Sequence, residues 1–248
     1  ILNIKKISFK NSFKRSNRVY FDSLNPDLFL NNFYSTESTH DSLLLYVFNS
    51  SIGYNINSNK DSIIQNLNIG WDSEILSYKN KLIDTILTNQ SLILHFSKRK
   101  KNNSFRLSAN FYPLGYKKNN YEINFLYESF ILKDKKLKIS ADLSEFRPVF
   151  EINNYQSNHH FWDNKNFNNI LYWNTSAEIF AGLFTLKSQI NQSYRPIYFT
   201  EYSEPSQFDS SLQVIQSSLN YNLIKKKYNL LTEIVYQYQG GAQILQLP

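Results

Sequence analysis

The sequence predicts an all-β protein made of long antiparallel strands, and three observations lead to this prediction. First, apolar and polar residues alternate along most of the 248 residues, which is the period of a strand with two different faces. Second, aromatic residues make up 16% of the chain although the mean hydropathy is -0.45, so apolar residues are numerous but dispersed. Third, no stretch carries a capped apolar helix stripe, and the longest apolar run, Leu43 to Phe48, is far shorter than the ~20 residues of a membrane-spanning helix.

About eleven strands are expected in order along the chain. In 104–112, Phe105 and Leu107 fall on one face while Arg106 and Asn110 fall on the other, and the remaining strands alternate in the same way. The expected strands lie near 1–9, 41–57, 62–77, 81–98, 104–112, 119–133, 136–146, 170–180, 182–191, 211–223 and 227–239.

The lengths of these strands favour a single antiparallel transmembrane β-barrel domain, an up-and-down meander over 1–248. Strands of ten or more residues with one apolar and one polar face are typical of an outer-membrane barrel. A soluble sandwich normally uses shorter strands and more turns with glycine or proline, and the chain has only six of each. The connections also alternate in length: short turns follow the even-numbered strands, and long loops are expected near 10–40, 145–169 and 192–210.

The polar face of the expected strands indicates a wet lumen. Its mid-strand residues are therefore candidates for lining a pore through which small polar solutes diffuse passively, selected by size and by the mixed charge of the wall. Two alternatives remain: a non-conducting scaffold barrel whose long loops fold inward and bind other envelope components, and a soluble β-rich binding protein whose apolar faces meet each other. The candidate pore-lining residues are Arg106, Asn110, Glu122, Glu128, Lys138, Asp142, Asn174, Glu178, Glu233 and Gln237.

The segment SNHHFWDN (157–164) holds two of the four histidines and resembles a metal or catalytic site at first sight. Adjacent strand residues point to opposite faces, however, so His159 and His160 cannot both bind one metal ion without a turn between them. We expect a loop motif that packs against the barrel rim, with a contact to a lumen ligand as the alternative. Its residues are Asn158, His159, His160, Phe161, Trp162, Asp163 and Asn164.

Other functional classes find little support in the composition. The chain has no cysteine, which excludes thiolate metal sites and cysteine nucleophiles, and it has no nucleophile signature of the GxSxG kind, so no enzyme, cofactor or metal is predicted. The net charge is +7, but many of the lysines form short clusters at expected turns such as 98–101 and 225–227. These clusters are typical of solvated turns and no recognition motif accompanies them, so nucleic acid is not an expected partner. Outer-membrane lipid and small polar solutes are the expected partners, and the sequence leaves the oligomeric state open.

Several motifs resemble one known family. NFYPLGYKKNNYEI (110–123), NYQSNHHFWDN (154–164) and QILQLP (243–248) are similar, in this order, to motifs of the putative porin family of Bacteroidota outer membranes, and THDSLLLYVFNSSIGY (39–54) resembles a strand of that family. The resemblance implies a porin-like β-barrel in the outer membrane of a Gram-negative bacterium. The sequence departs from the family by lacking a signal peptide and the C-terminal strands, so we expect an incomplete, open portion of the barrel.

Overall fold

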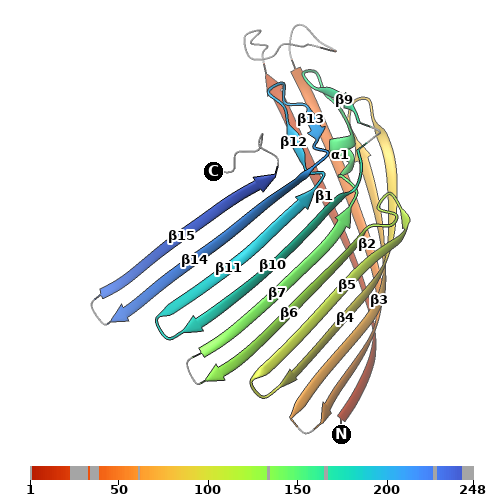
Figure 1. The fold of residues 1–248 in the computed structure, drawn as a ribbon. Coiled ribbons are helices and arrows are strands. Elements are labelled where there is room, and N and C mark those ends of the chain that lie inside the picture. Colours follow the sequence, from red (N-terminus) through yellow and green to blue (C-terminus); the bar gives the residue numbers. More distant parts are fainter. Residues whose placement is uncertain are drawn as a thin grey trace.

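The computed structural model describes residues 2–22, 33, 39–60, 62–132, 135–164, 167–225 and 228–241. Its main feature is one antiparallel sheet of eleven strands, in which each long strand pairs with the next long strand along the chain. The sheet curves and twists without closing, and β1 and β15 form its two edges (Figure 1). The predicted fold class, an all-β antiparallel meander that forms an open portion of a barrel, is thus confirmed. The segment QILQLP lies outside the described residues.

Ten of the eleven long strands agree closely in position with those expected from the sequence, and β1 is longer than expected. Their bounds are β1 (Leu2–Asp22), β2 (Thr39–Lys60), β3 (Ile63–Lys79), β4 (Asp84–Lys100), β5 (Asn103–Gly115), β6 (Tyr121–Leu132), β7 (Lys135–Phe146), β10 (Ile170–Ala181), β11 (Phe184–Tyr194), β14 (Ser211–Lys225) and β15 (Tyr228–Gly241).

Tight connections join these strands at the end of the sheet where the chain begins, and two of them, residues 101–102 and 182–183, lie wholly within the described residues (Figure 1). A two-residue hairpin requires positive φ because its twist must match that of the strands. Ser62 has φ 64, Lys101 has φ 44 and Gly182 has φ 61, as this geometry demands.

The first strand is longer than the sequence suggested. The expected loop near 10–40 is wrong over 10–22, because β1 continues to Asp22 and pairs with β2 along its whole length, from Leu2 opposite Asn59 to Asp22 opposite Thr39. The frequent lysines and arginines of this stretch mimic a loop. Lys10, Lys14 and Arg18 stand on one face of a strand, however. The other face carries Phe9, Phe13 and Phe21, together with Arg15.

The two later long connections contain small elements of their own. Residues 147–169 hold α1 (Phe150–Asn153), β8 (Asn154–Gln156) and β9 (Phe161–Asp163), and residues 195–210 hold β12 (Ile197–Phe199) and β13 (Pro205–Gln207). The small strands form two separate two-stranded hairpins, β8–β9 and β12–β13. All of these elements gather at the end of the sheet opposite the tight turns (Figure 1).

Candidate functional site

The two faces of the sheet differ sharply in chemistry, and the strand register defines them. One row of paired residues reads Leu94, Ala109, Ile123, Leu143 and Trp173 across five consecutive strands. The adjacent row, one residue along each strand, reads His95, Ser108, Asn124, Asp142 and Asn174. Because neighbouring strand residues point to opposite sides, the first row belongs to an apolar face and the second to a polar face.

The apolar face remains open to the surroundings. Phe9 is 75% exposed, Ile86 is 68% exposed and Ile234 is 65% exposed, and all three stand on this face. Among the described residues only Tyr78 and Ile170 are buried hydrophobic side chains. A soluble sandwich would bury the apolar face against a second sheet, and no such layer exists in the described part of the chain.

All ten candidate pore-lining residues stand on the polar face, as the register of β5, β6, β7, β10, β14 and β15 shows. Several of them make polar contacts with neighbours on that face. Glu128 lies 3.8 Å from Arg106, Lys138 lies 3.5 Å from Glu178, and Asn174 donates to Asn191. Lys136 lies 2.6 Å from Glu128, so that carboxylate holds two cations. That these residues line a water-filled pore stays a prediction.

Amide and hydroxyl side chains also link neighbouring strands along the polar face. Asn68 donates to Asn55 at 2.5 Å, and Asn55 donates to Ser8 at 3.1 Å, which connects β3, β2 and β1. Gln189 donates to Gln216 at 2.7 Å between β11 and β14. Such ladders satisfy one another's polar groups and leave a hydrophilic surface.

The connection from β7 to β10 crosses the polar face and reaches strands far from its origin. Phe150 of α1 packs edge-on against Tyr78 of β3 at 5.0 Å between ring centroids. The Asn158 backbone N–H donates to the Asp41 carboxylate of β2 at 2.8 Å, and the Asn80 side chain donates to the Gln156 carbonyl at 3.1 Å. Since β2 is the fifth strand from β7 in the sheet order, roughly 24 Å along the sheet, residues 147–164 fold over the inside of the curve. We call residues 147–164 the inward segment.

The YPLGY motif forms the support for the inward segment. Gly115 has φ 102, and a Cβ there would lie 2.0 Å from the Thr88 carbonyl oxygen, so only glycine allows this hairpin to press against β4. The Tyr116 hydroxyl donates to the Pro148 carbonyl at 2.8 Å and accepts from Asn153 at 2.5 Å. Burial raises the pKa of the Tyr116 phenol, which keeps this hydroxyl protonated as a donor.

A charged contact fixes the same hairpin to the polar face. The Lys117 ammonium lies 2.9 Å from the Glu74 carboxylate of β3, which also accepts from the Asn89 amide at 2.8 Å. Asn89 is 2% exposed and accepts the Lys117 backbone N–H at 2.8 Å. The hairpin 112–120 is therefore joined to β3 and β4 by a polar cluster in which Asn89 is buried and Lys117 and Glu74 are partly buried.

The histidine segment lies within this packing. Asn158 is 2% exposed and His159 is 6% exposed, while Trp162 donates its indole N–H to the Glu151 carbonyl at 2.9 Å. His159 meets the Tyr20 ring of β1, and His160 lies beside Trp162, so the two imidazoles have different neighbours. Burial lowers the pKa of His160, with His159 adding to the effect. No group of three or more potential metal-ligating side chains occurs within the described ranges.

The aromatic residues of this segment pack against one another and against nearby loops. Trp162 stacks on Tyr155 at 4.7 Å and meets Phe199 of β12 edge-on at 6.4 Å, which connects the inward segment to the β12–β13 hairpin. Phe161 meets Phe33 at 6.0 Å. Asp163 pairs with Asn154 in the β8–β9 hairpin, and the Asn164 backbone N–H donates to the Asn153 carbonyl at 2.6 Å.

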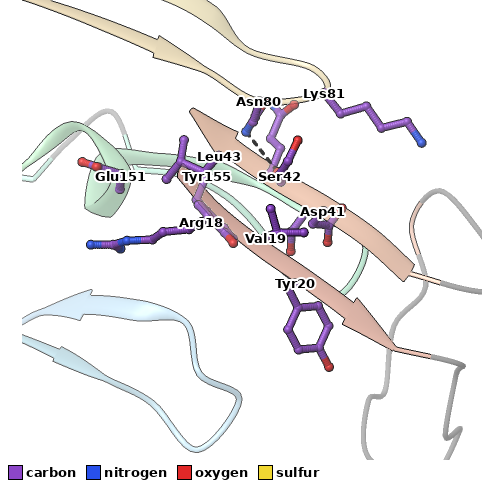
Figure 2. A pocket seen from close by; sticks show the side chains of 12 residues that line it. Arg18, Val19, Tyr20, Asp41, Ser42, Leu43, Asn80, Lys81, Glu151 and Tyr155 are labelled. Carbon is purple, nitrogen blue, oxygen red and sulfur yellow. Dashed lines mark hydrogen bonds between the residues drawn. The ribbon is translucent and has the colours of Figure 1, made fainter. Parts of the chain in front are cut away.

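A pocket of about 280 Å³ opens between the inward segment and the ends of β1 and β2 (Figure 2). Figure 2 shows Tyr155 near its centre, Arg18 and Glu151 extending toward one side, and Lys81 and Asp41 on the other. Val19, Leu43 and Tyr20 supply apolar surface to its lining. The pocket can therefore accept a small molecule that carries both apolar and charged groups.

Sequence reasoning did not find the residues that hold the inward segment, namely Glu74, Tyr78, Asn89, Tyr116, Lys117 and Asn153. Each of them sits at or near a strand end and reads as an ordinary strand or turn residue. Gly115 within the aromatic YPLGY stretch is the one signal that could have indicated a close approach of two backbones.

No helix in the described part of the chain is long and apolar enough to cross a bilayer. Comparison with curated proteins and with solved structures found no match. A family model described as "Putative porin" matches residues 2–248. The chain therefore belongs to this porin family of outer-membrane β-proteins.

Proposed function

We propose that the sheet forms the wall of a channel through the outer membrane of a Gram-negative bacterium, and that small polar solutes diffuse through it passively. The observation that carries the proposal is the register, which sets a fully apolar row beside a fully polar row across five strands. The apolar face meets lipid hydrocarbon, and the polar face meets water in the lumen.

The height of the apolar face supports this orientation. On β2 the apolar face runs from Phe48 to Ile56, and the row across the sheet continues with residues such as Trp71 and Leu92. Nine residues extend ~27 Å along a strand, or ~20 Å along the membrane normal at a tilt of ~45°, which approaches the ~25 Å apolar band of outer-membrane barrels.

Size and charge of the lumen wall select the solutes in this proposal. Away from β1, paired charges such as Lys138 with Glu178, and amide ladders such as Asn55 with Asn68, offer hydrogen bonds without a single dominant sign of charge. The inward segment narrows the passage at the end of the sheet that carries the long connections, because it crosses from β7 to the ends of β1, β2 and β3.

A second candidate function is a non-conducting scaffold barrel, and the inward segment is the observation that favours it. If this segment filled the lumen, the exposed parts of the long connections would bind other components of the envelope. The two candidates differ in one property, which is whether water and ions pass.

Reconstitution of the full-length protein into planar bilayers tests the proposal. We expect discrete conductance steps, and we expect larger steps when Phe150–Asn158 is replaced by a Gly-Ser linker of equal length. A control replacement in the exposed connection 200–204 should leave the step size unchanged. Folded, inserted protein that never conducts, with or without the inward segment, would favour the scaffold instead.

A further inference from the structure

Basic residues occur at every fourth position along β1. Because side chains alternate between the two sides of a strand, residues four apart stand on the same face, roughly 13 Å from one another. Hydroxyl side chains fill the intervening positions of that face. In order, the face of β1 reads Lys6, Ser8, Lys10, Ser12, Lys14, Ser16 and Arg18. We call the four cations the β1 basic row.

The register places the β1 basic row on the polar face of the sheet. Lys6 pairs with Asn55, whose amide belongs to the ladder with Asn68 and Ser8, and Lys10 pairs with Ser51. The opposite face of β1 carries Ile7, Phe9 and Phe13. The four cations therefore stand inside the curve and not toward lipid.

These cations are not neutralised by described carboxylates. All four side chains are exposed, and none lies within ion-pair distance of a described acidic residue, whereas Lys136 and Lys138 each have a glutamate within that distance. Two of the acids that β2 and β3 present on this face are engaged elsewhere: Asp41 accepts from the Asn158 backbone, and Glu74 holds Lys117.

Two further acids lie near the row. Glu151 lines the pocket together with Arg18, at the last position of the row (Figure 2), and near the middle of the row stands Asp72. It lies in line with Lys10 but two strands away, roughly 10 Å between backbones, on the far side of Ser51. At an ionic strength of 0.1 M the Debye length is about 10 Å, so Asp72 weakens the field of the row most at Lys10 and less at the neighbouring positions. Glu122 and Asp142 are five or more strands from β1 and are screened from it.

The last cation of the row lines the pocket described above. Arg18 and Lys81 contribute cations to its wall, and Asp41 and Glu151 contribute carboxylates. The Arg18 guanidinium extends from β1 beside the inward segment (Figure 2). A pocket of about 280 Å³ admits a small organic molecule. The row therefore runs from this pocket along the polar face toward the tight-turn end of the sheet.

We propose that the β1 basic row is a path for small oxyanions, meaning solutes with a carboxylate or phosphate group, and that the pocket at Arg18 is their entry site. This inference rests on the proposed channel function and names its preferred solutes. The fields of successive cations overlap when the Debye length exceeds half their spacing, a condition already met at 0.1 M salt and met more fully at 0.01 M, where the length is about 30 Å. An anion thus moves between neighbouring attractive positions without leaving the row.

The test compares two double variants of the full-length protein with equal loss of charge. Lys10→Gln with Lys14→Gln removes two cations from the polar face, and Lys5→Gln with Arg15→Gln removes two from the opposite face of the same strand. Reversal potentials are measured across planar bilayers in a KCl gradient at low salt. We expect the wild type to prefer chloride over potassium, the first variant to lose ~3-fold or more of this preference, and the control to retain it.

Binding to the folded protein in vesicles gives a second readout that does not need conduction. The probes are the 31P line width of inorganic phosphate and the 13C line width of labelled acetate, each measured for wild type, both double variants and Arg18→Gln. Broadening that is lost in the Lys10, Lys14 variant and in Arg18→Gln but kept in the control supports the oxyanion path, even if the protein never conducts. In that case only the channel function fails. Equal broadening and equal reversal potentials in wild type and the polar-face variant would overturn the inference.

Discussion

Replacing Glu74 with alanine should release the hairpin that supports the inward segment. The change removes the acceptor of the Asn89 amide at 2.8 Å and the partner of the Lys117 ammonium at 2.9 Å. A buried donor left without a partner costs ~1–3 kcal/mol, and Asn89 is 2% exposed. The ion pair, whose side chains are 33% and 24% exposed, adds ~1 kcal/mol.

Together these contributions amount to ~2–4 kcal/mol, which raises the population of the released hairpin by a factor of ~30 to ~700. Hydrogen exchange measures this population directly. The Tyr116 and Lys117 amides, which donate to Thr88 and Asn89, should lose protection by that factor. A double-mutant cycle with Lys117→Met should give a coupling energy of ~1 kcal/mol between the two side chains.

Lys79 and Asp84 provide a matched control pair. Their charged groups are also 2.9 Å apart, but the side chains are 59% and 64% exposed. The variants Lys79→Met and Asp84→Ala should each change the free energy of local opening, measured by hydrogen exchange of nearby amides, by less than ~1 kcal/mol. The reason is that an exposed ion pair contributes little. Two results would refute this reasoning: unchanged protection of the hairpin amides in Glu74→Ala, or a coupling energy between Lys79 and Asp84 as large as that between Glu74 and Lys117. Either would mean that partial burial does not determine the strength of the Glu74–Lys117 contact.

Three further predictions concern the wall, the hairpin and the histidine segment. Ile139→Arg should cost ~2–4 kcal/mol in folding into vesicles, because a charge on the lipid face is expensive, whereas Lys138→Ala on the polar face should cost little; equal effects would contradict the assigned faces. Gly115→Ala should destabilise the protein in denaturant titrations far more than Gly182→Ala. A Cβ added at Gly115 would lie 2.0 Å from a carbonyl oxygen, whereas a Cβ added at Gly182 would meet no atom within 4 Å. Burial holds the pKa of His160 below 6.5 beside His159, with Glu204 and Asp41 opposing the shift, so the folded segment binds its proton less tightly than the unfolded one. The inward segment should thus be most stable above pH ~6.5, and its stability should fall as the pH drops through the pKa of folded His160. Proteolysis of 150–164 should therefore be faster at about pH 5 than at about pH 7.5. The variant His160→Gln should abolish that difference.

The strands and their two faces could be predicted because a strand's period is a local property of the sequence. Alternation in 104–112 and 136–146 places Leu107 and Ile139 on one face, and the register of the structure agrees. The short turns follow from the same local pattern, because the chain must reverse between two alternating stretches. β1 was predicted too short for a physical reason: its cations resemble a solvated loop unless their spacing of four residues is considered.

The inward segment could not be predicted because its contacts join residues far apart in the chain. Tyr78 and Phe150 meet only because the sheet curves, and Asn158 reaches Asp41 only because β2 lies opposite β7 across that curve. The histidine segment was expected to pack against the rim. In the structure it lies against residues of β1 and β2 on the polar face, with Asn158 at 2% exposure.

The position of the aromatic residues on the polar face explains why the inward segment narrows the passage in our proposal and does not fill it. Tyr20, Tyr78 and Tyr112 stand near the strand ends that carry the long connections, and the first two contact the inward segment directly. Between these ends and the tight turns the polar face carries amides, hydroxyls and charges, such as the ladder of Asn55 and Asn68, which gain nothing from an apolar covering. The inward segment makes ring contacts with Tyr20 and Tyr78 near these ends, and these contacts stabilise it at one end of the sheet. In our proposal the middle of the polar face therefore meets water, as a channel requires and a filled scaffold does not.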